Sequence, residues 1–241
     1  FPYMTPTGQN YDSGEYDRAL TKALEISSYA RLRAEQKERL ARADRKLLGV
    51  GMACYVEMCG FGPYESAVVR AEPGGSVTAF TGTSSHGQGH ETTFAQIIAD
   101  QLGVDFDKIQ VRHGDTANTP MGNGTGGSRS LVVGGSAILR ASLKVQEKAR
   151  RIAAHMLEAA PDDVVFADGR YQVKGAPAKA LTFEKIAAQA HTDALPEGME
   201  AGLEASDFFR PPALVYPFGA HVAVVEVDRE TGSVKVLDYV S

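Results

Sequence analysis

Two short segments of the chain gather glycines with hydroxyl, amide and imidazole side chains, and each precedes a predicted helix. The first covers residues 82–91 and reads GTSSHGQGHE. Glycine tolerates positive φ and lets the backbone approach a ligand closely, and the free N–H groups at a helix N-terminus favour anions such as phosphate. Gln88, between Gly87 and Gly89, can donate and accept hydrogen bonds. The pattern indicates a loop for an anionic ligand, with a tight turn that binds nothing as the alternative.

The second segment covers residues 122–130 and reads GNGTGGSRS. Four glycines and three hydroxyl groups stand directly before a predicted helix, so this loop is a second candidate cradle for an anion. Arg129 has two interpretations that the sequence leaves open. Its guanidinium could bind a phosphate, or it could pair with a carboxylate of the protein.

Two other chemistries fit these segments less well. His86 and His90 are four residues apart, as in zinc sites, but the intervening Gly-Gln-Gly disfavours the helix that such a pair requires. Gly122, Gly124 and Gly127 satisfy the spacing of a nicotinamide-binding turn. However, no strand comes immediately before them, and the acid about 20 residues further on falls inside a helix rather than at a strand end.

The composition excludes several classes of protein. Its net charge of −5 is spread over mixed acidic and basic residues, without the basic stripe of a nucleic-acid-binding protein. No apolar run is long enough for a membrane span, and the first residues do not form a signal peptide, so we expect a cytoplasmic protein. Cys54 and Cys59 are too few to hold an iron–sulfur cluster and lack the spacing of a zinc or redox pair.

The elements that flank the two loops follow from hydrophobic periodicity. Two strands, residues 67–71 and 76–81, flank a Glu-Pro-Gly-Gly turn and lead into the first loop, which is followed by a helix over 91–102. A short strand over 109–113 precedes the second loop, and a long helix over 131–159 follows it.

The remaining patterns predict hairpins and isolated helices. Helices are expected from about residue 15, with Ser13 as N-cap, and over 29–46 and 181–190. Strands are expected over 48–59, and hairpins over 164–173 and 220–240. This mixture predicts an α+β fold with mixed or antiparallel sheets and packed helices. We expect a helical lead-in over residues 1–47, a ligand-binding domain over 48–205 and the start of a second α+β subdomain over 206–241.

The first loop and its helix, TSSHGQGHETTFAQI over residues 83–97, resemble a motif of the molybdenum hydroxylase large subunits, the family of xanthine dehydrogenase, aldehyde oxidase and carbon monoxide dehydrogenase. Further matches occur in order along the chain, at FPYMTP (1–6), GTGGSRS (124–130), HMLE (155–158), GLEA (202–205) and YPFG (216–219). The resemblance implies a molybdenum ion on a molybdopterin, in its cytosine dinucleotide form. It places the cofactor contacts at Gly87, Gln88, Gly89, His90, Thr125, Gly127, Ser128 and Ser130.

Two residues depart from the pattern of carbon monoxide dehydrogenases. His86 stands where those enzymes tend to have Gln, and Gly126 where they tend to have Tyr. Both departures favour a relative that acts on a substrate other than carbon monoxide.

The resemblance also implies a function. It predicts an oxidoreductase that hydroxylates carbon monoxide, an aldehyde or an N-heterocycle, with water as the oxygen source and with iron–sulfur clusters and FAD on partner chains. The base glutamate and the arginine-containing active-site loop of the family have no counterpart in this sequence, so we assign no catalytic residue and no metal ligand. The chain begins with Phe1 and ends directly after a predicted strand, so we expect an internal piece of a longer subunit, inactive alone. The alternative is a stand-alone, non-catalytic fragment that binds the cofactor or a partner chain.

Overall fold

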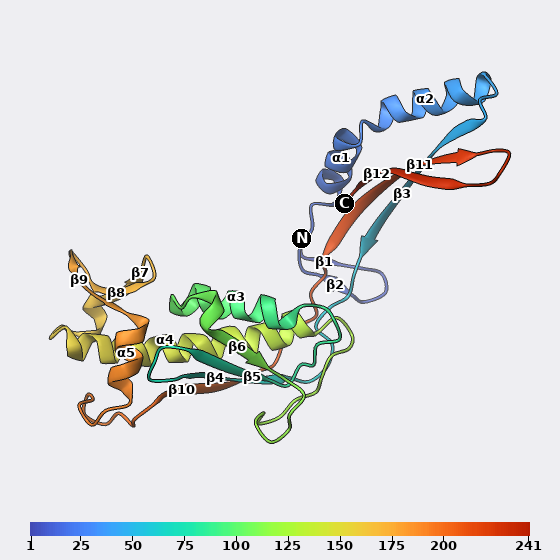
Figure 1. The fold of residues 1–241 in the computed structure, drawn as a ribbon. Helices are drawn as coiled ribbons and strands as arrows, with labels where there is room; N and C mark the ends of the chain where they lie inside the picture. The colour runs from blue at the N-terminus through green and yellow to red at the C-terminus, as the bar shows by residue number, and fades with distance from the viewer. The chain divides into compact units, whose positions relative to one another are not determined.

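The computed structural model describes all 241 residues, which form two compact units (Figure 1). Unit 1 comprises Phe1–Cys59 and Leu214–Ser241, and unit 2 comprises Gly60–Ala213. Unit 2 contains both glycine-rich loops.

A four-stranded sheet forms the base of unit 2, in the order β10-β4-β5-β6. Its strands are β4 (Glu65–Ala71), β5 (Val77–Thr81), β6 (Ile109–Arg112) and β10 (Leu203–Phe209). The β4–β5 hairpin closes through a turn in which the Glu72 N–H donates to the Ser76 carbonyl at 2.8 Å. β6 runs parallel to β5, whereas β10 and β4 are antiparallel, so the sheet is mixed.

Two helices, α3 (His90–Leu102) and α4 (Ser136–Met156), pack on one face of this sheet (Figure 1). Strand side chains at every second position and helix side chains one turn apart meet in a single core. Its fully buried members include Val69, Ala79, Phe94, Ile98 and Ile138. This core fixes the end of β5 and the start of both helices, which are the points where the two loops begin or end.

A smaller sheet completes unit 2. Its strands are β7 (Val164–Ala167), β8 (Arg170–Val173) and β9 (Ala176–Thr182), in sequential order, and α5 (Phe183–Ala190) follows directly. Tyr171 is fully buried, and burial raises the pKa of its hydroxyl well above the usual range. Two single-turn 3₁₀-helices, Phe106–Lys108 and Pro161–Asp163, lead into β6 and β7.

Unit 1 is built on a three-stranded antiparallel sheet in the order β12-β11-β3. Its elements are β1 (Tyr3–Met4), β2 (Asn10–Tyr11), α1 (Tyr16–Ile26), α2 (Tyr29–Ala41), β3 (Lys46–Val56), β11 (Phe218–Asp228) and β12 (Val234–Val240). Both longer helices pack on the sheet through small clusters, such as that of Leu32, Leu48 and Val224. None of the helices in the structure combines the length and apolar character needed to cross a lipid bilayer.

The α+β fold predicted from the sequence is confirmed, with several local corrections. The helix over 29–46 ends at Ala41, because β3 already begins at Lys46. The position before α1 is occupied by Glu15, so the prediction of Ser13 as its N-cap is wrong. Strands β1, β2, β9 and β10 were not predicted.

The two units divide the chain differently from the three ranges 1–47, 48–205 and 206–241. β11 pairs with β3 along its whole length, from Phe218–Val56 to Asp228–Lys46. This long-range pairing joins the two ends of the chain into one unit and leaves Gly60–Ala213 as the other.

Candidate functional site

The first loop runs from the end of β5 at Thr81 to the first residue of α3, His90. Gly87 and Gly89 have φ of 103° and 76°, and a Cβ built on either would meet no atom within 4 Å. The loop therefore uses glycine for backbone conformation and leaves open space beside it. The exposed Gln88 turns its side-chain carbonyl back to accept from the His86 N–H.

His90, the first residue of α3, is buried at the end of this loop. Its side chain is 8% exposed and stacks on Phe94 with ring centroids 5.5 Å apart. Burial lowers the pKa of His90, which favours the neutral imidazole. Its Nδ1 atom is buried and has no hydrogen-bond partner within the protein. A buried polar atom without a partner is rare, so this nitrogen is a candidate ligand contact.

Glu91, in the first turn of α3, interacts with the residue that follows β6. Its carboxylate oxygen lies 2.7 Å from Nε2 of His113. This hydrogen bond, supported by the backbone N–H of Glu91 itself and the Ser85 hydroxyl, lowers the pKa of Glu91 to about 2. This hydrogen bond ties the start of α3 to the residue after β6.

Because the pKa of Glu91 is depressed in the folded protein, its contribution to stability is complete above the unfolded pKa of about 4.5 and is lost as the pH falls through about 2. We expect Glu91→Gln to unfold more easily than the wild type at pH 5, and the difference between them to shrink as the pH falls toward 2. Urea unfolding at four pH values measures it. A difference that stays constant from pH 5 to pH 2 would contradict this assignment.

The second loop is held by a buried ion pair. Arg129 Nη1 lies 2.6 Å from Oε2 of Glu65, and the two side chains are 5% and 0% exposed. This contact decides between the two interpretations of Arg129, because its partner is a protein carboxylate. Glu65 was not among the predicted site residues. Its position at the start of β4, ahead of the apolar Ala67, Val68 and Val69, was the available signal, since an unpaired glutamate is rarely buried.

The two loops meet in space. The Ser84 N–H donates to the Thr125 hydroxyl at 3.1 Å, and that hydroxyl lies 2.9 Å from the Ser130 hydroxyl. A Cβ on Gly82 would lie 2.3 Å from the Cα of Gly122, so only glycine allows the backbones to pass so closely.

The helix after the second loop also approaches the first. A π-helical turn, Ser130–Gly135, precedes α4, although the sequence predicted one regular helix. A Cβ on Gly134 would lie 2.4 Å from Cγ2 of Thr83, so this turn packs directly against the base of the first loop. Single π-helical turns are frequent at functional sites.

The predicted site residues therefore fall into two groups. Thr125 and Ser130 lie at the crossing of the loops, and Ser130 and His90 are buried. The others lie on exposed or partly exposed backbone of the two loops: Gly87, Gln88, Gly89, Gly127 and Ser128. Gly127 and Ser128 have φ of 58° and 49°, and their carbonyls accept from the N–H groups of residues 61 and 60. No three His, Cys, Asp or Glu side chains are grouped so as to hold a metal ion.

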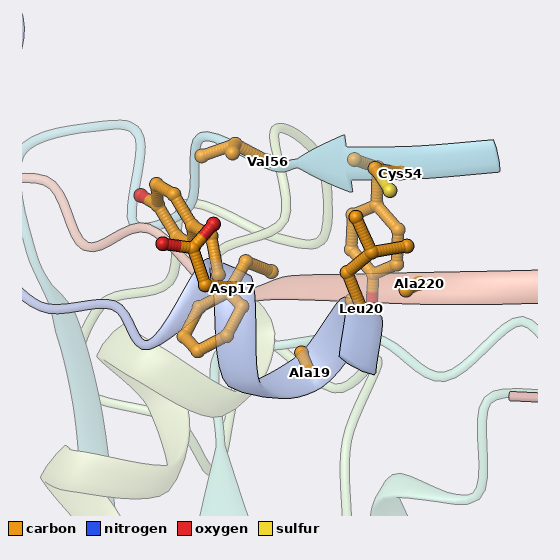
Figure 2. A pocket seen from close by; sticks show the side chains of 10 residues that line it. Asp17, Ala19, Leu20, Cys54, Val56 and Ala220 are labelled. Atoms are coloured by element: carbon orange, nitrogen blue, oxygen red, sulfur yellow. The ribbon is translucent and has the colours of Figure 1, made fainter. Parts of the chain in front are cut away.

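A separate hollow belongs to unit 1 and contains none of these residues. Figure 2 shows it between side chains of α1, β3 and β11, among them Leu20, Cys54 and Ala220. Its lining is mainly apolar, and Asp17 is its only charged residue. It offers no set of donors for an anion, so the crossing of the glycine-rich loops is the stronger candidate.

The sequence of this chain is similar to those of known proteins. A sequence model described as molybdopterin cofactor-binding domain matches residues 22–241. The large chain of carbon monoxide dehydrogenase from Hydrogenophaga pseudoflava is 45% identical over 98% of this chain and 31% of its own length.

Two solved structures are similar to this chain over almost its whole length. Carbon monoxide dehydrogenase from Oligotropha carboxidovorans is 42% identical with a TM-score of 0.89, and quinoline 2-oxidoreductase from Pseudomonas putida 86 is 38% identical with a TM-score of 0.86. Each match covers 99% of this chain and 32% of the solved one, so the chain spans about a third of the length of these relatives. As the motifs in its loops predicted, the chain belongs to the family of molybdopterin cofactor-binding domains.

Proposed function

We propose that the two crossing loops hold the molybdopterin of a molybdenum-dependent hydroxylase, and that this chain is the cofactor-binding portion of its large subunit. The observation that carries the proposal is the hydrogen bond from the Ser84 N–H to the Thr125 hydroxyl. It joins the two glycine-rich segments at a single place, through residues that are 41 positions apart in the sequence. The contacts proposed are Gly87, Gln88, Gly89 and His90 from the first loop, and Thr125, Gly127, Ser128 and Ser130 from the second.

The residues present fit such a group. The backbone beside Gly87, Gly89 and Gly124 is open, since a Cβ on any of them would touch nothing within 4 Å. The N-terminus of α3 supplies N–H groups with partial positive charge, which suit a phosphate. The buried Nδ1 of His90 lacks a partner that a polar ligand atom would supply.

When bound, the molybdenum cofactor supplies the redox chemistry of hydroxylation, with water as the proposed source of oxygen. The chain's own residues bind and orient it: the loop amides and hydroxyls hold its polar edge, and the core under β5, α3 and α4 keeps the loops in place. No general acid or base is assigned to this chain.

The proposed substrate is carbon monoxide, an aldehyde or an N-heterocycle. The relatives named above are a carbon monoxide dehydrogenase and a quinoline 2-oxidoreductase. The presence of His86 and Gly126, in place of Gln and Tyr, favours a substrate other than carbon monoxide. Three further expectations remain predictions: the cytosine dinucleotide form of the cofactor, partner chains that carry iron–sulfur clusters and FAD, and a cytoplasmic location.

The test is an analysis of molybdenum and nucleotide in the whole protein that contains this chain, followed by a substrate screen. We expect molybdenum together with cytidine nucleotide. We also expect Gln88→Glu to retain about tenfold less of both, because it adds a negative charge beside an anionic ligand. Gln96→Glu, on the exposed face of α3, is the matched control and should retain both. Equal retention by the two variants would refute the assignment of the site.

A further inference from the structure

The Glu65–Arg129 pair is buried completely, although burial of an ion pair adds little net stability. Removing two charges from water costs about as much as their attraction returns, and apolar replacements of such pairs are often neutral. In this structure the carboxylate is 0% exposed and the guanidinium 5%. The role of such a pair lies in the neighbouring groups that it orients, and its other hydrogen bonds identify these groups.

The Arg129 guanidinium donates only to groups of the protein. Nε donates to the Phe61 carbonyl at 2.7 Å, Nη1 to the Gly124 carbonyl at 2.7 Å, and Nη2 to the Tyr64 carbonyl at 2.5 Å. Together with the bond to Glu65, these contacts engage all three nitrogens. The guanidinium therefore acts on the backbone of residues 61–64 and of the second loop.

The Glu65 carboxylate accepts from the same loop. The Asn123 N–H donates to it, at 3.2 Å from Oε2 and 3.3 Å from Oε1. The carboxylate also lies under the crossing of the two loops, because a Cβ on Gly82 would be 2.0 Å from Oε1. A single buried acid thus touches both glycine-rich segments.

These contacts set the direction of two peptide groups of the second loop, the one between Gly122 and Asn123 and the one between Gly124 and Thr125. The negative carboxylate draws the Asn123 N–H inward, and the positive guanidinium draws the Gly124 carbonyl inward. In a planar trans peptide the N–H points opposite to the C=O. The Thr125 N–H therefore points away from Arg129, while the Thr125 hydroxyl receives the Ser84 N–H.

We infer that Glu65 and Arg129 are positioning residues, which orient the peptide groups of residues 122–125 so that the second loop presents the Thr125 N–H to an anionic, phosphate-bearing pterin. This inference rests on the proposed function. In this role neither side chain contacts the ligand. Both act on ligand binding through the backbone of the second loop.

The experiment uses the whole protein in its cofactor-loaded form. Glu65→Gln removes the negative charge. Glu65→Asp keeps both charges but shortens the side chain that carries the carboxylate. Arg129→Lys also keeps both charges but replaces the planar guanidinium by a single ammonium group. Asp207→Asn is the matched control, because Asp207 is the other buried carboxylate of unit 2 and pairs with Lys144 at 2.8 Å. The readouts are hydrogen exchange of the amides over 122–130, compared with those of α4, and the half-time of molybdenum retention after gel filtration.

We expect each variant of the pair to raise exchange over 122–125 about tenfold or more relative to α4, and to shorten retention by a similar factor. The control should change both by less than about twofold, even if its unfolding midpoint falls. The two charge-conserving variants keep the test decisive if Glu65→Gln does not fold. Rises in exchange that are uniform over unit 2, rather than concentrated over 122–125, would overturn the inference.

Failure of the inference and failure of the proposed function are distinguishable. If Gln88→Glu loses the cofactor while the variants of the pair retain it, the loops bind the cofactor but the pair does not position them. If Gln88→Glu also retains it, the proposed site itself is refuted, and the inference with it.

Discussion

Replacing Arg129 by methionine is expected to lower the free energy of unfolding of unit 2 by about 3–5 kcal/mol, because it leaves the Glu65 carboxylate buried without its counter-charge. The carbonyls of Phe61, Tyr64 and Gly124 would lose their donors as well. Urea unfolding followed by circular dichroism at neutral pH measures the change.

A surface pair provides the comparison for Arg129→Met. Lys108 is 45% exposed and lies 3.6 Å from Glu184, so Lys108→Met should cost at most about 1 kcal/mol. The double variant Glu65→Leu/Arg129→Met should recover part of the loss, since it removes both charges. A single variant Arg129→Met as stable as Lys108→Met would show that the carboxylate is not buried as described.

Gly82→Ala is the second substitution with a large expected effect. Gly82 does not have a positive φ, so the backbone tolerates alanine, and the cost is steric. The new methyl would lie 2.0 Å from Glu65 Oε1 and 2.3 Å from the Cα of Gly122, and neither neighbour is the end of a flexible surface side chain. Overpacking of this kind costs about 1–3 kcal/mol, and separation of the two loops should also reduce cofactor retention.

Gly126→Ala is the control for Gly82→Ala. Gly126 lies in the second loop without a positive φ, and a Cβ there meets nothing within 4 Å. Thermal unfolding and molybdenum content should therefore stay within about 0.5 kcal/mol and about twofold of the wild type. If both glycine variants behave alike, the close approach of the loops does not govern stability or binding.

The sequence predicted those elements whose signals are local. The Glu-Pro-Gly-Gly turn at 72–75 defines the β4–β5 hairpin, and the periodicity of Phe94, Ile98 and Leu102 defines α3. The glycine-rich composition marked both loops as candidate binding segments. Glycine serves positive φ at Gly87 and Gly89, and close backbone approach at Gly82 and Gly122. Each of these signals lies within about a dozen residues.

Features that depend on distant partners could not be predicted. β10 pairs with β4 across more than 130 residues, and its exposed Glu204 and Ser206 leave no continuous apolar pattern, so no strand was predicted there. In the π-helical turn before α4, Gly134 packs against Thr83, a contact that the local sequence does not reveal. Likewise, the choice between a phosphate and a carboxylate as partner of Arg129 required the fold to bring Glu65 beside it.

Because β3 pairs with β11, unit 2 is an insertion between two paired strands. The chain enters and leaves it through neighbouring segments of unit 1. The Glu57 N–H donates to the Pro217 carbonyl, and the Cys59 N–H to the Val215 carbonyl, both at 2.9 Å. A polypeptide cut at one exposed point between residues 60 and 213 would therefore stay tethered on both sides of the cut. For the same reason, a circular permutant with new termini in that interval, or a swap of this interval between relatives, would leave the supporting sheet of unit 1 intact.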